Sequence, residues 1–257
     1  MKIKKYMLKE KNILFFLPSL ITCSSILCGL WAIFICFANE KLEIAILLIA
    51  LAGCFDAVDG RFARWLKQTG KFGIELDSLA DFLSFGVAPM IIFYNSYPWN
   101  DDLKAFSILS IFPICMALRL ARFNLLAMEP TAGNIKLANF QKNFFFGLAA
   151  PVGAIALLLP IIASSLNIFT FACSNCVLLY AFIIALLLVI PMPIFSHKFL
   201  HFGFKTKKDI IFTLSAFISF LFFLYYPMYC LIILSGLYCC TIPISIIFYN
   251  YKKRKLR

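Results

Sequence analysis

Residues 42–81 read LEIAILLIALAGCFDAVDGRFARWLKQTGKFGIELDSLAD. The apolar run Ile44–Phe55 stops at Asp56, and the next apolar run, Leu79–Tyr94, has Asp81 inside it. Ionisable groups at membrane depth cost free energy, so they persist where they pair, bind cations or serve a function. One apolar run that stops at an aspartate and a second that contains one therefore predict a helical membrane protein with a functional site between two helices.

The composition of the whole chain supports a membrane location. Of the 257 residues, 63% are hydrophobic, whereas soluble domains are usually about 45–50% apolar. A helix needs about 20 apolar residues to cross the hydrocarbon layer of a bilayer. We therefore expect an all-α bundle of about eight membrane-spanning helices. The predicted spans are Ile13–Phe37, Leu42–Asp59, Asp77–Tyr97, Ala105–Asn124, Phe144–Leu166, Phe169–Phe195, Ile210–Tyr226 and Met228–Tyr249.

The chain is expected to form a single domain. No linker, repeat or low-complexity tract divides residues 1–257. A core of six helices would occupy about residues 13–201, and the last two predicted spans would form an extra hairpin at about residues 210–249. The sequence does not define the role of this hairpin.

The positive charges predict the topology of the helices. The net charge is +12, which on a soluble protein would indicate nucleic-acid binding. Here 22 of the 24 Lys and Arg residues lie in alternate gaps between the apolar runs, and only Lys41 and Lys104 lie in the others. Cytoplasmic segments are enriched in Lys and Arg, so both termini are predicted in the cytoplasm. We expect a multi-pass protein of the inner (cytoplasmic) membrane, surrounded by lipids and without a nucleic-acid partner.

Four aspartates of the opening stretch are spaced as two helical pairs. Asp56 and Asp59 are three residues apart, and Asp77 and Asp81 are four apart. Each spacing places two side chains on one helix face. The connection 60–72 is short, so both pairs are expected at the same end of two antiparallel helices. Carboxylates at one depth repel each other unless cations bind, and oxygen ligands favour Mg²⁺, Mn²⁺ or Ca²⁺.

The same residues could also have purely structural roles. The aspartates could cap helices or pair with Arg61 and Arg64. The small residues Gly60, Ala63 and Gly73 would let a ligand approach the backbone, and Arg64 would neutralise phosphate oxygens, as a pyrophosphate site requires. Small residues also mediate the packing of membrane helices, which is the alternative for these positions.

The spacing resembles that of a known family. Residues 56–81 read D-x-x-D-G-x-x-A-R-x8-G-x-x-x-D-x-x-x-D, which is similar, without a departure, to the characteristic motif of the CDP-alcohol phosphatidyltransferases. The resemblance covers about Phe16–His201. It implies a six-helix membrane core and the transfer of a phosphoryl-linked group from a CDP-activated donor to an alcohol. Dimers are common in this family, so a homodimer is implied as well.

The resemblance also implies roles for individual residues. Asp56, Asp59 and Asp77 would be ligands of a pair of divalent ions, Mg²⁺ or Mn²⁺, and Asp81 would be a ligand, the general base or both. An attacking alcohol needs a base to take its proton, and Asp81 is our choice because it lies deepest along the motif. The implied CDP-binding residues are Asp56, Asp59, Gly60, Ala63, Arg64, Gly73 and Asp77.

Further stretches resemble the members of the family that use serine. They are residues 75–89 (ELDSLADFLSFGVAP), 118–124 (LRLARFN) and 146–154 (FGLAAPVGA). The implied reaction transfers the phosphatidyl group of CDP-diacylglycerol to L-serine and gives phosphatidylserine and CMP at the cytoplasmic surface. Related first helices often begin with Pro-Asn, whereas this chain has Pro18-Ser19 and then Ser24-Ser25. We expect the polar contact there to be altered rather than lost.

Arg119, Arg122 and Asn124 are the candidate acceptor-binding residues. They lie at the predicted cytoplasmic end of the fourth span, and guanidinium groups bind carboxylates such as that of serine. Alternatively, the two arginines only set the topology. Glycerol 3-phosphate or inositol phosphate as acceptor is the nearest alternative, and it would need a tighter basic cluster near Asp81. A cation-coupled transporter or a structural membrane protein would be a different class of protein.

Cysteines supply one more motif. The chain has ten of them, mostly inside apolar runs, where cysteine behaves as a small hydrophobic residue. Cys173 and Cys176 form a C-x-x-C, which is redox-active, metal-binding or without a special role. No second pair and no neighbouring histidine supports a zinc site.

Overall fold

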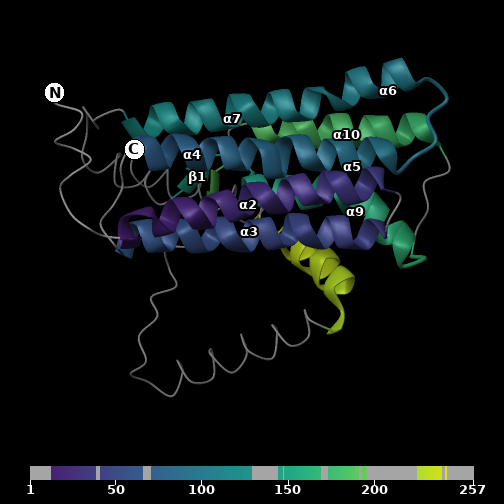
Figure 1. The fold of residues 1–257 in the computed structure, drawn as a ribbon. Helices are drawn as coiled ribbons and strands as arrows, with labels where there is room; N and C mark the ends of the chain where they lie inside the picture. Colours follow the sequence, from purple (N-terminus) through teal and green to yellow (C-terminus); the bar gives the residue numbers. More distant parts are fainter. Residues whose placement is uncertain are drawn as a thin grey trace.

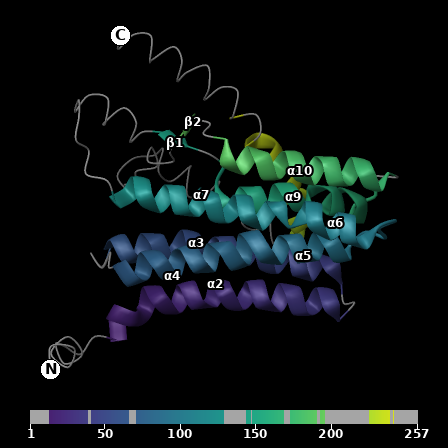
Figure 2. The same ribbon diagram turned by 90° about the horizontal axis from the view of Figure 1, so that it is seen from above.

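A computed structural model of the chain describes residues 13–38, 41–65, 71–128, 144–146, 148–168, 173–190, 193–195, 225–238 and 241. The helices with their bounds are α2 Ile13–Phe37, α3 Leu42–Trp65, α4 Lys71–Asp81, η1 Phe82–Val87, α5 Ala88–Asn95, α6 Asp102–Leu109, α7 Ile111–Met128, α9 Ala150–Ser165 and α10 Ser174–Val189. They run side by side as a bundle (Figure 1). Seen from above, α2 lies on one face, and α7, α9 and α10 lie on the other (Figure 2).

The first two predicted spans form the hairpin of α2 and α3, which pack along each other. α2 has the predicted bounds, whereas α3 continues past Asp59 to Trp65. The predicted connection from Gly60 is therefore wrong at its start. Residues 61–65 contain no proline or glycine, so nothing in them ends the helix. The motif from Asp56 to Arg64 is consequently helical throughout.

The third span changes its helix type in the middle. α4 is followed without a break by the π-helical segment η1 and then by α5. The backbone N–H of Ala88 bonds to the carbonyl of Leu83, five residues back. Pro89 explains this change, because it has no N–H to offer Phe85 and its ring would clash with that carbonyl in an α-helix. Such π-helical turns are frequent at functional sites, and this one begins directly after Asp81.

The fourth span consists of α6 and α7 and begins three residues before the predicted Ala105. The side chain of Asp101 accepts a hydrogen bond from the backbone N–H of Lys104 at 3.0 Å. This bond caps the first turn of α6 and fixes its start. The two helices meet at Ser110, just before Pro113, whose ring disfavours a regular helix through the preceding turn.

The predicted spans 144–166 and 169–195 are shorter than expected. Their helical parts are α9 and α10, and the outer ends form an antiparallel pair of the strands β1 Phe144–Phe146 and β2 Pro193–Phe195. The prediction of helix at these ends is wrong. Pro151 is favoured in the first turn of a helix, and Pro191 cannot continue one. The other elements described are helical, in agreement with the predicted class.

Within the part of the chain that the structure describes, three continuous segments are long and apolar enough to cross a membrane: Ser19–Phe37, Phe72–Asn95 and Asp102–Leu125. α9, α10 and the helix Pro227–Tyr238 are shorter apolar helices. α3 is long as well, but its C-terminal part carries the charged motif. Most of the predicted span Ile210–Tyr226 lies outside the described residues. The total of eight spans and the location of the termini therefore stay predictions.

The centre of the bundle forms where η1 meets α2 and α7. Ser84, Phe85 and Gly86 of η1 are buried. The hydroxyl of Ser84 donates to the carbonyl of Ser25 at 3.0 Å, and the hydroxyl of Ser25 donates to the carbonyl of Ala52 at 3.3 Å. Interhelical hydrogen bonds of this kind tie membrane helices together, and here they join η1, α2 and α3.

Gly29→Val should destabilise this centre. A Cβ at Gly29 would lie 2.9 Å from Ser84 Oγ and 3.1 Å from Ser84 Cα, and the second is a backbone atom that cannot rotate away. We expect a loss of about 1–3 kcal/mol in the free energy of unfolding, as for other overpacked sites, measured by thermal unfolding in detergent. Gly236→Val is the matched control, because nothing described lies within 4 Å of a Cβ there. Equal losses in both variants would contradict the close contact at Gly29.

Candidate active site

Three carboxylates of α3 and α4 lie close together. The end of α3 and the start of α4 lie at the same end of the bundle (Figure 1). Asp56 and Asp59 come from α3 and Asp77 comes from α4, and each offers an oxygen within 4.8 Å of the other two. Asp59 is 4% exposed, and the other two are half-buried. Helical spacing, with few residues between the two helices in the sequence, explains why residues from α3 and α4 reach one place.

Asp81 lies beside this cluster rather than in it. Its carboxyl group interacts electrostatically with those of Asp56, Asp77 and Asp59. Among the described residues, Arg119 of α7 is the cation that acts on it. Asp81 therefore lies next to the three possible ligands and near a positive charge.

Thr22 is a site residue that the sequence reasoning missed. It is buried on α2, and its hydroxyl donates to Asp59 Oδ2 at 2.7 Å. This hydrogen bond orients a buried carboxylate that would otherwise be poorly satisfied. A signal existed in the sequence, because Thr22 precedes Ser25 by three residues on the same helix face. Ser25 bonds to α3 as well, so the polar contact expected of the first helix is present in altered form.

The motif glycines border open space. A Cβ at Gly60 or Gly73 would meet no described atom within 4 Å, whereas one at Gly153 would lie 2.6 Å from Leu188 Cδ2. Packing among the described residues therefore does not account for Gly60 and Gly73. Ala63 and Arg64 lie on the last turns of α3, but their side chains lie outside the described residues.

The three residues predicted to bind the acceptor differ in their contacts with the described residues. Arg122 donates through Nη1 to the carbonyl of Val189 at 2.9 Å, and Asn124 donates through Nδ2 to Ser78 Oγ at 2.9 Å. Arg119 has a buried Nε without a hydrogen-bond partner among the described residues, and its charge acts on Asp81 and Asp56. Arg119 is therefore the arginine that faces the carboxylates.

The donor set fits a hard divalent cation. The carboxylate oxygens of Asp56, Asp59 and Asp77 are the ligands that Mg²⁺, Mn²⁺ and Ca²⁺ prefer. Among the described residues, no cysteine or histidine joins this group. The open side at Gly60 and Gly73 leaves room for further oxygen atoms of a ligand.

Fold and site together define a helical membrane protein with an acidic cluster that has the oxygen donors of a divalent-cation site. The chain belongs to the CDP-alcohol phosphatidyltransferase family, whose model matches residues 15–191. This match includes the whole aspartate motif, and it leaves the helix Pro227–Tyr238 outside. The resemblance inferred from the motif is thus confirmed at the level of the family.

Curated proteins of several organisms are similar to the chain. A CDP-diacylglycerol–serine O-phosphatidyltransferase of Mycobacterium leprae is 38% identical over 142 residues, which are 55% of this chain and 45% of that protein. The protein of the same name from Helicobacter pylori is 35% identical over 151 residues, 59% of each. That of Methanocaldococcus jannaschii is 42% identical over 110 residues, 43% of this chain and 46% of that protein. The chain spans about half the length of the curated relatives it matches.

Thr22→Val should weaken metal binding. Valine keeps the shape of threonine but removes the hydroxyl that holds Asp59. Loss of a hydrogen-bond partner of a metal ligand usually costs about 10–100-fold in metal affinity, and we expect a similar rise in the Mn²⁺ dissociation constant. Titration of Mn²⁺ against thermal stability measures it. Thr22→Ser keeps the donor and should bind Mn²⁺ like the parent protein. Unchanged affinity in Thr22→Val would show that the bond does not orient Asp59.

Proposed function

We propose that the protein transfers the phosphatidyl group of CDP-diacylglycerol to the hydroxyl of L-serine, giving phosphatidylserine and CMP. The observation that carries this proposal is the cluster of Asp56, Asp59 and Asp77, with Asp81 and Arg119 beside it, inside the family-matched region. Such a site combines cation ligands for a pyrophosphate donor, a group that can take a proton, and an arginine for a carboxylate-bearing acceptor. The names of the similar proteins agree with this donor and acceptor.

The acidic cluster would hold the donor. Asp56, Asp59 and Asp77 would bind one or a pair of Mg²⁺ or Mn²⁺ ions, and bound divalent cations neutralise the charge of a pyrophosphate. The open space at Gly60 and Gly73 accommodates the cytidine and its phosphates against the backbone. From the family motif, Ala63 and Arg64 would border the same groove. The acyl chains of the lipid stay in the bilayer, which explains a site at the end of the helices.

Asp81 would be the general base. The serine hydroxyl oxygen forms a bond to the phosphorus that carries diacylglycerol, and the bond from that phosphorus to CMP breaks. The hydroxyl proton passes to the Asp81 carboxylate, and CMP leaves with the electron pair of the broken bond. Asp81 suits this role because its carboxyl group lies beside the ligand cluster and interacts with Asp56 and Asp77.

Arg119 would bind the carboxylate of serine. Its buried Nε has no hydrogen-bond partner among the described residues, and a buried unpaired donor is costly unless a ligand satisfies it. Arg122 is instead directed to the carbonyl of Val189, which makes it a link between α7 and α10. Asn124 contacts Ser78, one residue after the ligand Asp77, and so supports the position of α4.

The alternatives receive less support from the geometry. A phosphate-bearing acceptor would need several cations near Asp81, but the described residues place Arg119 there and turn Arg122 toward Val189. In a transporter, carboxylates lie near the midplane between broken helices. Here they lie toward one end of the bundle, six to nine residues before the end of α3 and six residues after the start of α4.

We place the acidic cluster on the cytoplasmic side of the inner membrane, in a bundle of eight spans with both termini on that side. Lys41 and Lys104, the two residues outside the positive-charge pattern, lie at the starts of α3 and α6, at the opposite end of the bundle from the cluster (Figure 1). Enrichment of Lys and Arg on the cytoplasmic side supports this orientation.

Release of CMP tests the proposed reaction. Purified protein with CDP-diacylglycerol and Mn²⁺ should release CMP when L-serine is added and form a lipid with the mass of phosphatidylserine, and chelation of the metal should stop it. Glycerol 3-phosphate and inositol phosphate are the competing acceptors. Release that follows one of these instead of serine would overturn the acceptor, and no release with any of them would overturn the transferase.

Asp81→Asn and Asp56→Asn should fail in different ways. An amide cannot accept the serine proton, so Asp81→Asn should lower kcat by about 10²–10⁴-fold while Mn²⁺ still binds to the remaining three carboxylates. Asp56→Asn removes a member of the ligand cluster and should lose metal and donor binding as well. Thermal-shift titration with Mn²⁺ and CDP-diacylglycerol, alongside turnover, separates the two effects. Equal loss of metal binding in both variants would make Asp81 chiefly a ligand.

Arg119→Ala should raise the serine KM. A hydrogen bond to a charged group contributes about 1.5–3 kcal/mol, so a rise of about 10–100-fold is expected, with little change in the KM for CDP-diacylglycerol. Arg122→Ala is the matched control on the same helix, and it should lower thermal stability while leaving the serine KM near normal. A larger rise in Arg122→Ala than in Arg119→Ala would reverse the assignment.

A further inference from the structure

A pair of thiols lies at the end of the bundle opposite to the carboxylates. Cys173 immediately precedes α10 and Cys176 lies in its first turn, at the end of the bundle where α5 ends and α6 begins (Figure 1). Both are exposed, whereas the described cysteines 28, 36, 115 and 230 are buried. The packing that accounts for the buried cysteines therefore does not account for this pair.

The first turn of α10 holds the two sulfur atoms together. Cys173 has an extended backbone with φ −114° and ψ 113°, and its carbonyl accepts a hydrogen bond from the backbone N–H of Cys176 at 3.1 Å. Its sulfur interacts with the Cys176 thiol and with the backbone N–H groups of Cys176 and Asn175. Side chains three residues apart on a helix are about 5–6 Å apart at Cβ, so a small rotation brings the sulfurs into bonding distance.

The environment favours reaction at Cys173. The backbone N–H and thiol of Cys176, with the backbone N–H of Asn175, lower the pKa of the Cys173 thiol. A lowered pKa means more thiolate at a given pH, and the thiolate is the form that attacks disulfides. Cys176 lies in contact as the second thiol that such a reaction requires.

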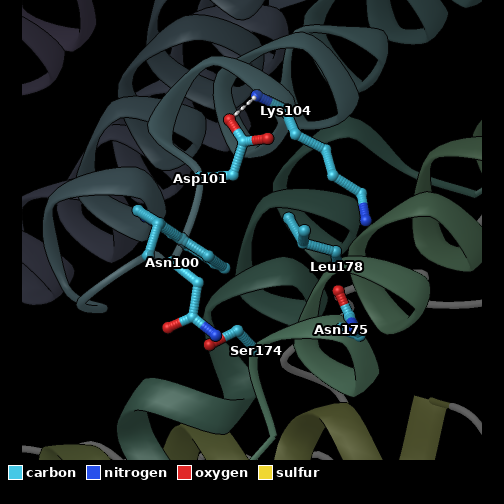
Figure 3. A pocket seen from close by; sticks show the side chains of 7 residues that line it. Asn100, Asp101, Lys104, Ser174, Asn175 and Leu178 are labelled. Atoms are coloured by element: carbon cyan, nitrogen blue, oxygen red, sulfur yellow. Dashed lines mark hydrogen bonds between the residues drawn. The ribbon is translucent and has the colours of Figure 1, made fainter.

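A pocket of about 220 Å³ adjoins the pair (Figure 3). Ser174 and Asn175, the two residues between the cysteines, line it, and so do Asp101 and Lys104 of the facing loop and helix. The side chain of Lys104 extends toward Leu178 and Asn175 (Figure 3). The pocket lining thus holds one positive charge, the ammonium group of Lys104, and one negative charge, the carboxylate of Asp101. A carboxylate of a small molecule is the group that the Lys104 charge would attract.

We propose that Cys173 and Cys176 are a reversible thiol–disulfide pair that exchanges with a small anionic disulfide drawn to the Lys104 pocket. The Cys173 thiolate attacks one sulfur of that disulfide, whose S–S bond breaks and releases one thiolate. Cys176 then loses its proton and attacks the Cys173 sulfur, which releases the second thiol. The protein thiols lose two electrons and two protons in total, and the external disulfide gains them.

The test uses the purified full-length protein and glutathione disulfide as the probe. After acid trapping and alkylation, mass spectrometry of the peptide with Cys173 and Cys176 should show a loss of two hydrogens and no alkylation, reversed by reduced glutathione. Cys54→Ser, a change at an exposed cysteine elsewhere in the bundle, should leave this reaction unchanged. In Cys173→Ser, Cys176 should stay alkylatable or carry glutathione. Alkylation of both thiols in the parent protein, or glutathione retained on either, would overturn the proposal.

The pocket is tested by the rate of oxidation. Lys104→Met keeps the length of the side chain and removes its charge. Oxidation by glutathione disulfide should therefore slow by about 3–10-fold, which is less than full electrostatic steering because only one charge is lost. Oxidation by the uncharged hydroxyethyl disulfide should keep its rate. Equal slowing with both reagents, or none with either, would overturn the role of the pocket. These readouts do not depend on CMP release, so they stand or fail separately from the proposed transferase.

Discussion

The buried carboxylate of Asp59 constrains the end of the bundle on which the chemistry depends. A carboxylate between two apolar helices is costly unless hydrogen bonds or opposite charges compensate it. The Thr22 hydroxyl supplies one bond from α2. Asp56 and Asp77 add further negative charges to the same cluster. The cluster is therefore stable only where positive charge or a proton balances them. Arg119, a shared proton and a divalent cation are the groups that can provide that balance.

The segment after Asp81 connects this electrostatic site with the core. Pro89 disrupts regular α-helical bonding, and η1 accommodates it by a bond from Ala88 to Leu83. Ser84 in the same segment bonds to α2, whose Gly29 permits the close approach. One continuous helix thus carries cluster residues at one end and central packing in its middle. The position of Asp81 consequently depends on contacts made one to two turns away from it.

The two ends of the bundle offer different chemistry, and α10 reaches both. Near its end, the carbonyl of Val189 accepts a hydrogen bond from Arg122 of α7. At its start, Cys173 and Cys176 share a turn next to the pocket formed with Lys104. Oxygen ligands at one end suit hard cations and phosphates, whereas thiols at the other suit exchange with disulfides. The length of the helix keeps these two sets of groups apart.

Three conclusions follow from the amino-acid sequence alone. They are the membrane class, the family, and the location of Asp56, Asp59 and Asp77 in one site. Those conclusions depend on local quantities, which are the length of apolar runs and the helical repeat that puts residues three or four apart on one face. The same local quantities do not predict the pairing of strand 144–146 with strand 193–195, because this is a contact between segments far apart in the sequence. Two contacts became visible only in the packed bundle. Thr22 donates a hydrogen bond to Asp59, and Arg119 lies near the carboxylates whereas Arg122 donates to the carbonyl of Val189. Both arginines lie on one helix, and the partner that each meets depends on how neighbouring helices pack against it.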